Sequence, residues 1–190
     1  GRDINLLTIG NQVESDLKIW ITARQHPGET MAEWFVEGLL GRLLDPQDPT
    51  ARALLDQATF YIVPNMNPDG AALGNLRTNA CGANLNREWL QPSVEKSPEV
   101  YYVREKMHET GVDLFLDIHG DETLPYVFVA GTEGVPNYSP NTAELERLFK
   151  TAFQAASPDF QDQHGYEKDQ PGQANLNMAT AYVGNTFGCL

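Results

Sequence analysis

Three residues of this chain have the types and spacing that a catalytic zinc site requires. His26 and Glu29 are three positions apart in the segment H-P-G-E, and His119 lies much later, in D-I-H-G. Catalytic zinc sites use three protein ligands and leave a fourth position for water. Zinc in such a site polarises a carbonyl group and makes its water acidic enough to attack near neutral pH. His26, Glu29 and His119 are therefore candidate ligands of one zinc ion.

Each of these segments also has an ordinary structural explanation when it is taken alone. For a single H-x-x-E pair, local hydrogen bonding of a loop histidine is the better explanation. The segment 67–70, N-P-D-G, has the composition of a tight turn. Arg77 alone would be a loop arginine, and Asn86 with Arg87 would be a solvated pair.

Apolar runs and amphipathic segments alternate along the chain, which predicts an α/β fold with a largely parallel or mixed sheet covered by helices. The expected strands are short and nearly continuous in apolar residues, as buried strands are. They are residues 17–24, 59–63, 114–118 and 126–130. The expected helices place apolar residues three or four positions apart. They run from Met31 to Leu43, from Pro98 to Glu109, and onward from Asn141.

Local signals predict where these elements begin and end. Ser97 is expected to cap the helix that starts at Pro98, and Gly111 to stop it. Asn141 with Glu144 has the pattern of a capping box. The apolar stretch 186–190 has the composition of the start of a strand.

The expected elements would bring the candidate ligands together. His26 and His119 each follow the end of a predicted strand. In sheets of this kind, ligands bind outside the carboxyl ends of the strands. Two strand ends on one edge would let residues far apart in the sequence converge on one ion.

Composition narrows the class of protein. A formal net charge of −13 over 190 residues argues against general affinity for nucleic acid or anionic membranes, because both depend on clustered Lys and Arg. The sequence contains neither an apolar run of ~20 residues, as a membrane span needs, nor a signal-peptide pattern. We expect a cytoplasmic protein with no nucleic-acid or membrane partner. The sequence does not define its oligomeric state.

Taken in order, the segments H-P-G-E, N-P-D-G, R-T-N-A-C-G-A-N-L-N-R-E-W and D-I-H-G resemble the zinc carboxypeptidases of the carboxypeptidase A type. Their form is most similar to the cytosolic carboxypeptidase subfamily, and the resemblance runs from about Gly1 to Leu190. It implies a three-layer α/β/α sandwich on a mixed, largely parallel twisted sheet. It also implies a zinc-dependent metallocarboxypeptidase that hydrolyses the C-terminal residue of peptides or proteins.

The resemblance assigns a role to each matching residue. His26, Glu29 and His119 would bind zinc. Arg77 would lie beside the scissile carbonyl and stabilise the developing oxyanion, a role that suits a fixed cation with planar donors. Asn86 and Arg87 would hold the terminal carboxylate of the substrate.

Some positions depart from the family pattern or stay open. Asn84 stands where many family members have an aspartate that supports a zinc-binding histidine. Asp117 is either a supporting carboxylate for His119 or an ordinary strand-end acid. Tyr166 and Tyr182 are candidates for the mobile tyrosine of the family, although ordinary packing explains either one.

The resemblance also implies a general-base glutamate on a late strand. The last glutamate of this chain, Glu167, lies in a hydrophilic segment. The run from Tyr182 to Leu190 resembles the lead-in to the catalytic strand, so we expect the base a few residues beyond Leu190. Residues 1–190 would then be one partial catalytic domain, truncated at its C-terminal end and inactive alone, with a β-rich domain before residue 1.

Two other functions remain open on the sequence alone. One is a zinc-dependent deacylase or amidase of small N-acyl amino acids, which shares the histidine and glutamate ligands. The other is a zinc- or peptide-binding protein without catalysis. The subfamily is associated with removal of glutamate from protein tails. The acidic charge of this chain, and the absence of Arg and Lys from residues 172–185, argue against that preference.

Overall fold

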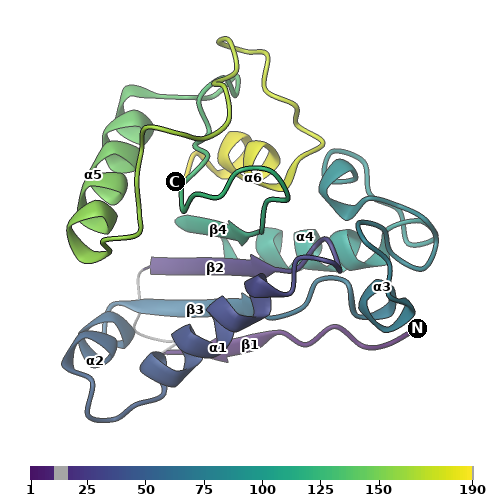
Figure 1. Cartoon of the computed structure of the whole chain (residues 1–190), viewed down its shortest axis with the longest axis horizontal. Coiled ribbons are helices and arrows are strands. Elements are labelled where there is room, and N and C mark those ends of the chain that lie inside the picture. The colour runs from purple at the N-terminus through teal and green to yellow at the C-terminus, as the bar shows by residue number, and fades with distance from the viewer. Residues whose placement is uncertain (11–16, 190) are drawn as a thin grey trace.

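The computed structural model describes residues 1–10 and 17–189. Its sheet has the strand order β1-β3-β2-β4 (Figure 1). The strands are β1 (Leu7–Ile9), β2 (Leu17–Ala23), β3 (Ala58–Val63) and β4 (Leu114–Ile118). The central strand β2 runs parallel to both β3 and β4, whereas β1 pairs antiparallel with β3. The sheet is therefore mixed and mostly parallel, as expected.

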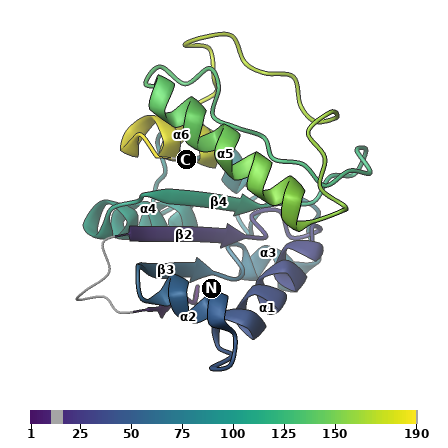
Figure 2. The same cartoon turned by 90° about the vertical axis from the view of Figure 1, so that its left-hand side faces the viewer.

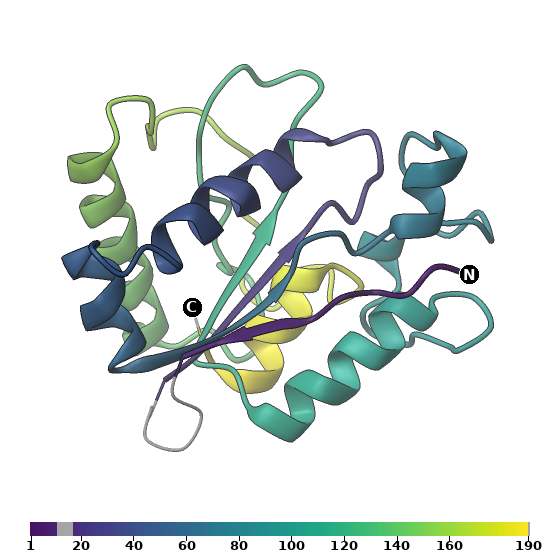
Figure 3. The same ribbon diagram turned by 90° about the horizontal axis from the view of Figure 1, so that it is seen from below.

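Helices cover both faces of the sheet and make three layers. Successive side chains of a strand point to opposite faces, so Trp20 and Ile21 enter different cores. Helices α1 (Met31–Leu43) and α2 (Pro49–Leu55) lie on the face of Ile21. Helices α4 (Pro98–Thr110) and α6 (Ala179–Phe187) lie on the face of Trp20. Figure 3 shows α1 on one side of the sheet and α4 and α6 on the other.

Three further helices are described in addition to these. Helix α5 (Pro140–Ala156) lies on the β4 side of the sheet, as Figures 1 and 2 show. Helix α3 (Pro68–Leu73) and the short 3-10 helix η1 (Leu85–Arg87) belong to the connection between β3 and α4. Among the described residues, no helix has both the length and the apolar content to cross a membrane.

Most of the expected elements are confirmed. The strands expected at 17–24, 59–63 and 114–118 are β2, β3 and β4, and β3 is buried along its whole length. Helix α1 has the expected bounds, and α4 begins at Pro98 and is stopped by Gly111 as expected. Ser97 does not cap α4 through its side chain; its hydroxyl oxygen accepts from the backbone N–H of Ser93 instead. The short strand β1 was not expected.

The strand expected at 126–130 is wrong. Val127 makes one isolated bridge to Phe160, and the surrounding residues form no strand. Their aromatic rings pack on the segment 157–170, since Tyr126 stacks on His164 and Phe128 meets Tyr166 edge-on. High β-propensity reflects packing on a pleated, half-buried surface, and these residues have a different packing partner.

The prediction that a strand starts at residues 186–190 is also wrong. Residues 179–187 form α6, and Gly188 ends it with a left-handed φ of 66°. The buried residues Ala179, Tyr182 and Val183 follow a helical spacing and pack into the core on the face of Trp20. Leu190 lies outside the described residues.

One predicted turn and one predicted helix start need correction. The segment N-P-D-G is the start of α3, where the Asn67 side-chain oxygen accepts from the Gly70 N–H at 3.1 Å. Helix α5 begins at Pro140, and Ser139 is its cap because its hydroxyl oxygen accepts from the Thr142 N–H. The capping box predicted from Asn141 is therefore wrong.

Gly70 packs α3 against the loop that follows β2. A Cβ atom built on Gly70 would lie 2.4 Å from the Thr78 carbonyl oxygen, 2.5 Å from the Asn67 side-chain oxygen and 2.8 Å from Pro27. Two of these three neighbours are oxygens of tightly bonded groups, which have little room to move. Only a glycine permits this approach.

Replacing Gly70 by Ala should lower the free energy of unfolding by about 1–3 kcal/mol, because the added methyl group overpacks this contact. The matched control is Gly38→Ala in α1, where a Cβ meets nothing within 4 Å. That change should raise stability by about 0.5–1 kcal/mol, because alanine is the better helix former. Urea denaturation of both variants measures the difference. A Gly70→Ala variant as stable as the parent would refute the packing argument.

Candidate metal centre

A tight turn after β2 places the first two candidate ligands. Arg24 has a left-handed φ of 57°, which is uncommon for a residue with a side chain. Its backbone N–H donates to Ile118 on β4, and its side chain donates to the Pro27 carbonyl oxygen and pairs with Glu33. These contacts fix the loop 24–30 beside the carboxyl end of β4, where His119 follows.

The structure brings the three predicted ligands together. His26 Nδ1 lies 2.7 Å from one oxygen of Glu29, and His119 Nδ1 lies 2.7 Å from the other. The candidate ligand atoms all lie within 4.8 Å of one another. His26 and Glu29 are buried, while 25% of the His119 side chain is exposed. The cluster is therefore closed on the side of His26 and open on the side of His119.

The outer nitrogen of each histidine, the Nε2 atom that faces away from Glu29, has its own hydrogen-bond partner. His26 Nε2 lies 3.0 Å from the Asn84 side-chain oxygen, and His119 Nε2 lies 2.7 Å from an Asp117 oxygen. An acceptor on Nε2 favours the tautomer whose Nδ1 lone pair is available to a metal. The structure thus favours Asp117 as a supporting carboxylate, and it places the Asn84 side-chain oxygen at hydrogen-bond distance from His26.

The charges of the cluster suit a cation. Burial acts to raise the pKa of Glu29, but hydrogen bonds from His119 and His26 outweigh it and lower that pKa to about 2. Burial acts to lower the pKa of His119, but the charges and hydrogen bonds of Asp117 and Glu29 together outweigh it and raise that pKa to about 10. Two carboxylates on opposite sides of His119 therefore make the cluster a place where positive charge is stabilised.

Arg77 lies at the edge of the cluster. One of its terminal nitrogens is 3.4 Å from His26 Nε2, and the other is 3.7 Å from Glu29. The second nitrogen also donates to Glu122 at 3.1 Å. Glu122 was missed in the sequence, because an exposed acid near His119 carries no signal of its contact with an arginine much earlier in the chain.

Asn86 also reaches the cluster, whereas the hydrogen bond of Arg87 is local. The Asn86 amide nitrogen is 3.4 Å from His119 Nε2, and its side-chain oxygen accepts from the Ala179 N–H at the start of α6. Arg87 is exposed and donates to the Asn86 carbonyl oxygen at 2.6 Å. The loop that bears both residues therefore lies against the cluster through Asn86.

The two candidate tyrosines have different surroundings. Tyr182 is buried beneath the Arg104 guanidinium, and its hydroxyl is 3.0 Å from His108 Nε2, so it packs in the core. Tyr166 is exposed and donates to Asp121, two residues after His119. Burial and the Asp121 carboxylate raise the pKa of Tyr166 to about 12. Only Tyr166 of the two is close to the cluster.

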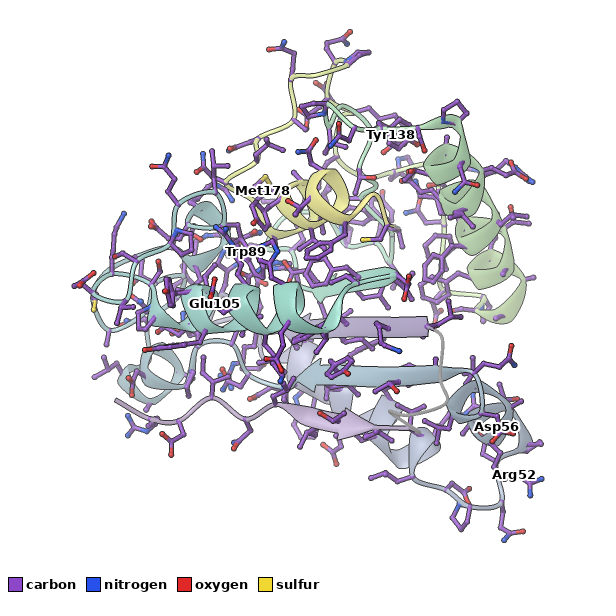
Figure 4. The ribbon with its side chains drawn as sticks, turned by 180° about the vertical axis from the view of Figure 1, so that it is seen from behind. Arg52, Asp56, Trp89, Glu105, Tyr138 and Met178 are labelled. Carbon is purple, nitrogen blue, oxygen red and sulfur yellow. The ribbon has the colours of Figure 1, made fainter. Side chains whose placement is uncertain are left out.

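Two buried residues, Gln25 and Trp89, lie behind the cluster; the sequence assigned Trp89 to packing or to the wall of the pocket and gave no role to Gln25. Gln25 precedes His26 and donates to Asp117, and the Trp89 indole N–H donates to Gln25 at 2.8 Å. Trp89 lies between α4 and the start of α6, where Met178 is labelled (Figure 4). A glutamine after a strand has the same sequence signature whether it is buried or solvated, so only the fold reveals this contact.

Comparison with known proteins gives a consistent result. Residues 1–186 match the sequence model of the zinc carboxypeptidase family. An uncharacterised protein of Zymomonas mobilis is 54% identical over 180 residues, which cover 95% of this chain and 47% of that protein. Mouse cytosolic carboxypeptidase 6 is 38% identical over 141 residues, which cover 68% of this chain and 26% of that protein.

A solved structure agrees closely with this fold. A metallo-carboxypeptidase from Pseudomonas aeruginosa, in complex with (2-guanidinoethylmercapto)succinic acid, is 56% identical and has a TM-score of 0.97. The match covers 100% of this chain and 50% of that chain. This chain thus spans about half the length of these bacterial relatives.

Replacing His26 by Ala should abolish stoichiometric zinc, because it removes one of three ligands and leaves two. The matched control is His164→Ala, which removes an exposed histidine that stacks on Tyr126. That variant should keep one zinc ion per chain. Atomic absorption after dialysis measures the content, and circular dichroism checks the fold. Retention of one zinc ion by folded His26→Ala protein would refute the assignment.

Proposed function

The chain belongs to the zinc carboxypeptidase family, and from this premise we propose that the full-length protein is a metallocarboxypeptidase that removes the C-terminal residue of peptides or proteins. One observation carries the proposal. The His26, Glu29 and His119 side chains converge with both Nδ1 atoms turned inward, and a guanidinium and an amide lie at the edge of the cluster.

The donor set of the cluster fits one zinc ion. Two imidazole nitrogens and a carboxylate are the ligands of many hydrolytic zinc sites, and each histidine has an acceptor on its outer nitrogen. When bound, zinc supplies a Lewis acid that polarises a carbonyl and lowers the pKa of water. The chain itself holds the three donor atoms in fixed positions. The open side of the cluster lies near His119.

Arg77 is proposed to stabilise the negative charge that develops on the scissile carbonyl oxygen. Its guanidinium is already within 3.4 Å of His26 and is held from the outer side by Glu122. A cation fixed in advance stabilises this charge without reorganising during the reaction. The planar donors of arginine suit an oxyanion better than a mobile ammonium would.

Asn86 and Arg87 are proposed to bind the substrate's terminal carboxylate. The Asn86 side-chain oxygen is already bonded to Ala179, which turns its amide nitrogen toward the cluster as a donor. The exposed Arg87 guanidinium would add charge-assisted hydrogen bonds. A carboxylate held at a fixed distance from the metal lets only the last peptide bond reach it. The Pseudomonas relative was solved with a succinic acid derivative, which supports a site for carboxylates.

The general base is proposed to be a glutamate outside these 190 residues. Glu167, the last glutamate of the chain, is exposed in a segment without regular structure. The chain covers about half of its bacterial relatives, which leaves room for a further catalytic strand. These residues alone would then hold the metal without turning over substrate. Tyr166 is the proposed mobile tyrosine, because it is exposed beside the residues that follow His119.

We do not expect this protein to prefer substrates with a C-terminal glutamate. Glu122 adds negative charge to the edge of the cluster, and the protein as a whole is acidic. Like charges would oppose an acidic tail. The likeness to cytosolic carboxypeptidases supports a cytoplasmic location, which we also propose.

The decisive substrate test uses two peptides that differ only at the C-terminus. Full-length protein with zinc should release the last residue from the free acid, and should leave the C-terminal amide intact because it lacks the carboxylate that Asn86 and Arg87 bind. Mass spectrometry of the products measures both reactions. Equal cleavage of the amide would contradict the proposal. Faster hydrolysis of N-acetyl amino acids than of the peptide would favour a deacylase instead.

A further inference from the structure

A buried glutamine joins the metal ligands to the loop proposed to bind the substrate. Gln25 is fully buried, and both ends of its side-chain amide are hydrogen-bonded. Its nitrogen donates to Asp117, and its oxygen accepts from the Trp89 indole N–H at 2.8 Å. Its backbone oxygen accepts from Asn67 at 2.9 Å. The residue is therefore fixed at three points.

The first of these bonds reaches a metal ligand. The Asp117 oxygen that accepts from Gln25 is the same oxygen that lies 2.7 Å from His119 Nε2. The other Asp117 oxygen accepts from the Thr22 hydroxyl at 2.8 Å, and 1% of the Asp117 side chain is exposed. Gln25 and Thr22 together thus fix the direction of this carboxylate, and Gln25 bonds the oxygen that faces the His119 ring.

The second bond reaches the opposite half of the site. Trp89 is fully buried two residues after Arg87, and its backbone N–H donates to the Asn177 carbonyl oxygen. Arg104 donates to the Trp89 carbonyl oxygen. The Trp89 backbone is thus held at both its N–H and its carbonyl oxygen, and the remaining polar atom of the residue, the indole nitrogen, donates to Gln25.

We propose that Gln25 is a positioning residue that couples zinc binding at His119 to the placement of the Asn86–Trp89 loop. A displacement of His119 reaches the Asn86–Trp89 loop, and a displacement of the loop reaches His119, through the hydrogen bonds of the Gln25 amide to Asp117 and Trp89. The link from Gln25 to the metal ligands rests on the geometry of the cluster alone. The effect of Gln25 on substrate binding rests on the proposed function. Because such coupling is reciprocal, a change at Trp89 must alter zinc affinity.

The amide of Gln25 satisfies both partners, because it offers a donor to Asp117 and an acceptor to the Trp89 indole N–H. A glutamate there would place a second negative charge against Asp117, and a methionine would leave the Asp117 oxygen and the Trp89 N–H without this bond. Unpaired buried groups destabilise the arrangement that contains them. Supporting residues of this kind commonly change metal affinity 10–100-fold when they are replaced.

The test measures zinc affinity in full-length protein by competition with a chelator, for Gln25→Met, Trp89→Phe and the double variant. Gln25→Met should weaken zinc binding about 10–100-fold, and Trp89→Phe should weaken it less. Because both changes break one chain of bonds, the double variant should be no weaker than Gln25→Met. The visible spectrum of the Co²⁺-substituted protein should shift in both single variants, as the His119 ring turns.

Trp20→Phe is the matched control. Trp20 is fully buried, and its indole N–H donates to the Thr110 hydroxyl at 3.1 Å, away from the cluster. This variant should lose thermal stability and keep its zinc affinity within about twofold.

The proposal is overturned if Trp89→Phe binds zinc as the parent does, or if Trp20→Phe loses as much affinity as Trp89→Phe. The milder Trp89→Phe variant decides the matter even where Gln25→Met does not fold. If the parent binds zinc but cleaves no peptide, the proposed function fails, and the affinities of the variants still test the role of Gln25.

Discussion

The hydrogen bonds on the outer nitrogens of two histidines are the constraint on which the site depends. Asn84 holds Nε2 of His26, and Asp117 holds Nε2 of His119, so both Nδ1 atoms point to Glu29. Without these acceptors, each ring could turn and present either nitrogen. The buried carboxylates then stabilise a cation between the rings, and the remaining groups of the site need only face the open side.

The fold makes this arrangement possible because it brings the carboxyl ends of two parallel strands together. Strands β2 and β4 are hydrogen-bonded neighbours, so the residues that follow them emerge side by side. The left-handed residue Arg24 ties the start of the loop after β2 to Ile118 on β4, and the close packing of Gly70 on Pro27 holds that loop from beside α3. Helices on both faces exclude water from the strands, so the open side of the site is left to the loops.

The sequence predicted the parts that follow from local chemistry. The convergence of His26, Glu29 and His119 was predicted from residue types that can bind zinc and from the ordered motifs around them, and β2, β3 and β4 were predicted because strands buried on both faces are continuously apolar. The helix α6 and the irregular segment 126–130 were misjudged, because tertiary packing overrides the β-propensity of their residues. Gln25 and Glu122 carry no local signal, since their roles depend on partners far away in the sequence.

The central claim is that zinc binds through the two inward Nδ1 atoms and Glu29. Diffraction from zinc-grown crystals of the full-length protein, recorded on both sides of the zinc absorption edge, tests it most directly. The account predicts one anomalous peak in contact with Nδ1 of His26, Nδ1 of His119 and the Glu29 carboxylate, with Asn84 and Asp117 still on the outer nitrogens. Coordination through either Nε2 atom, or a peak away from these residues, would contradict it.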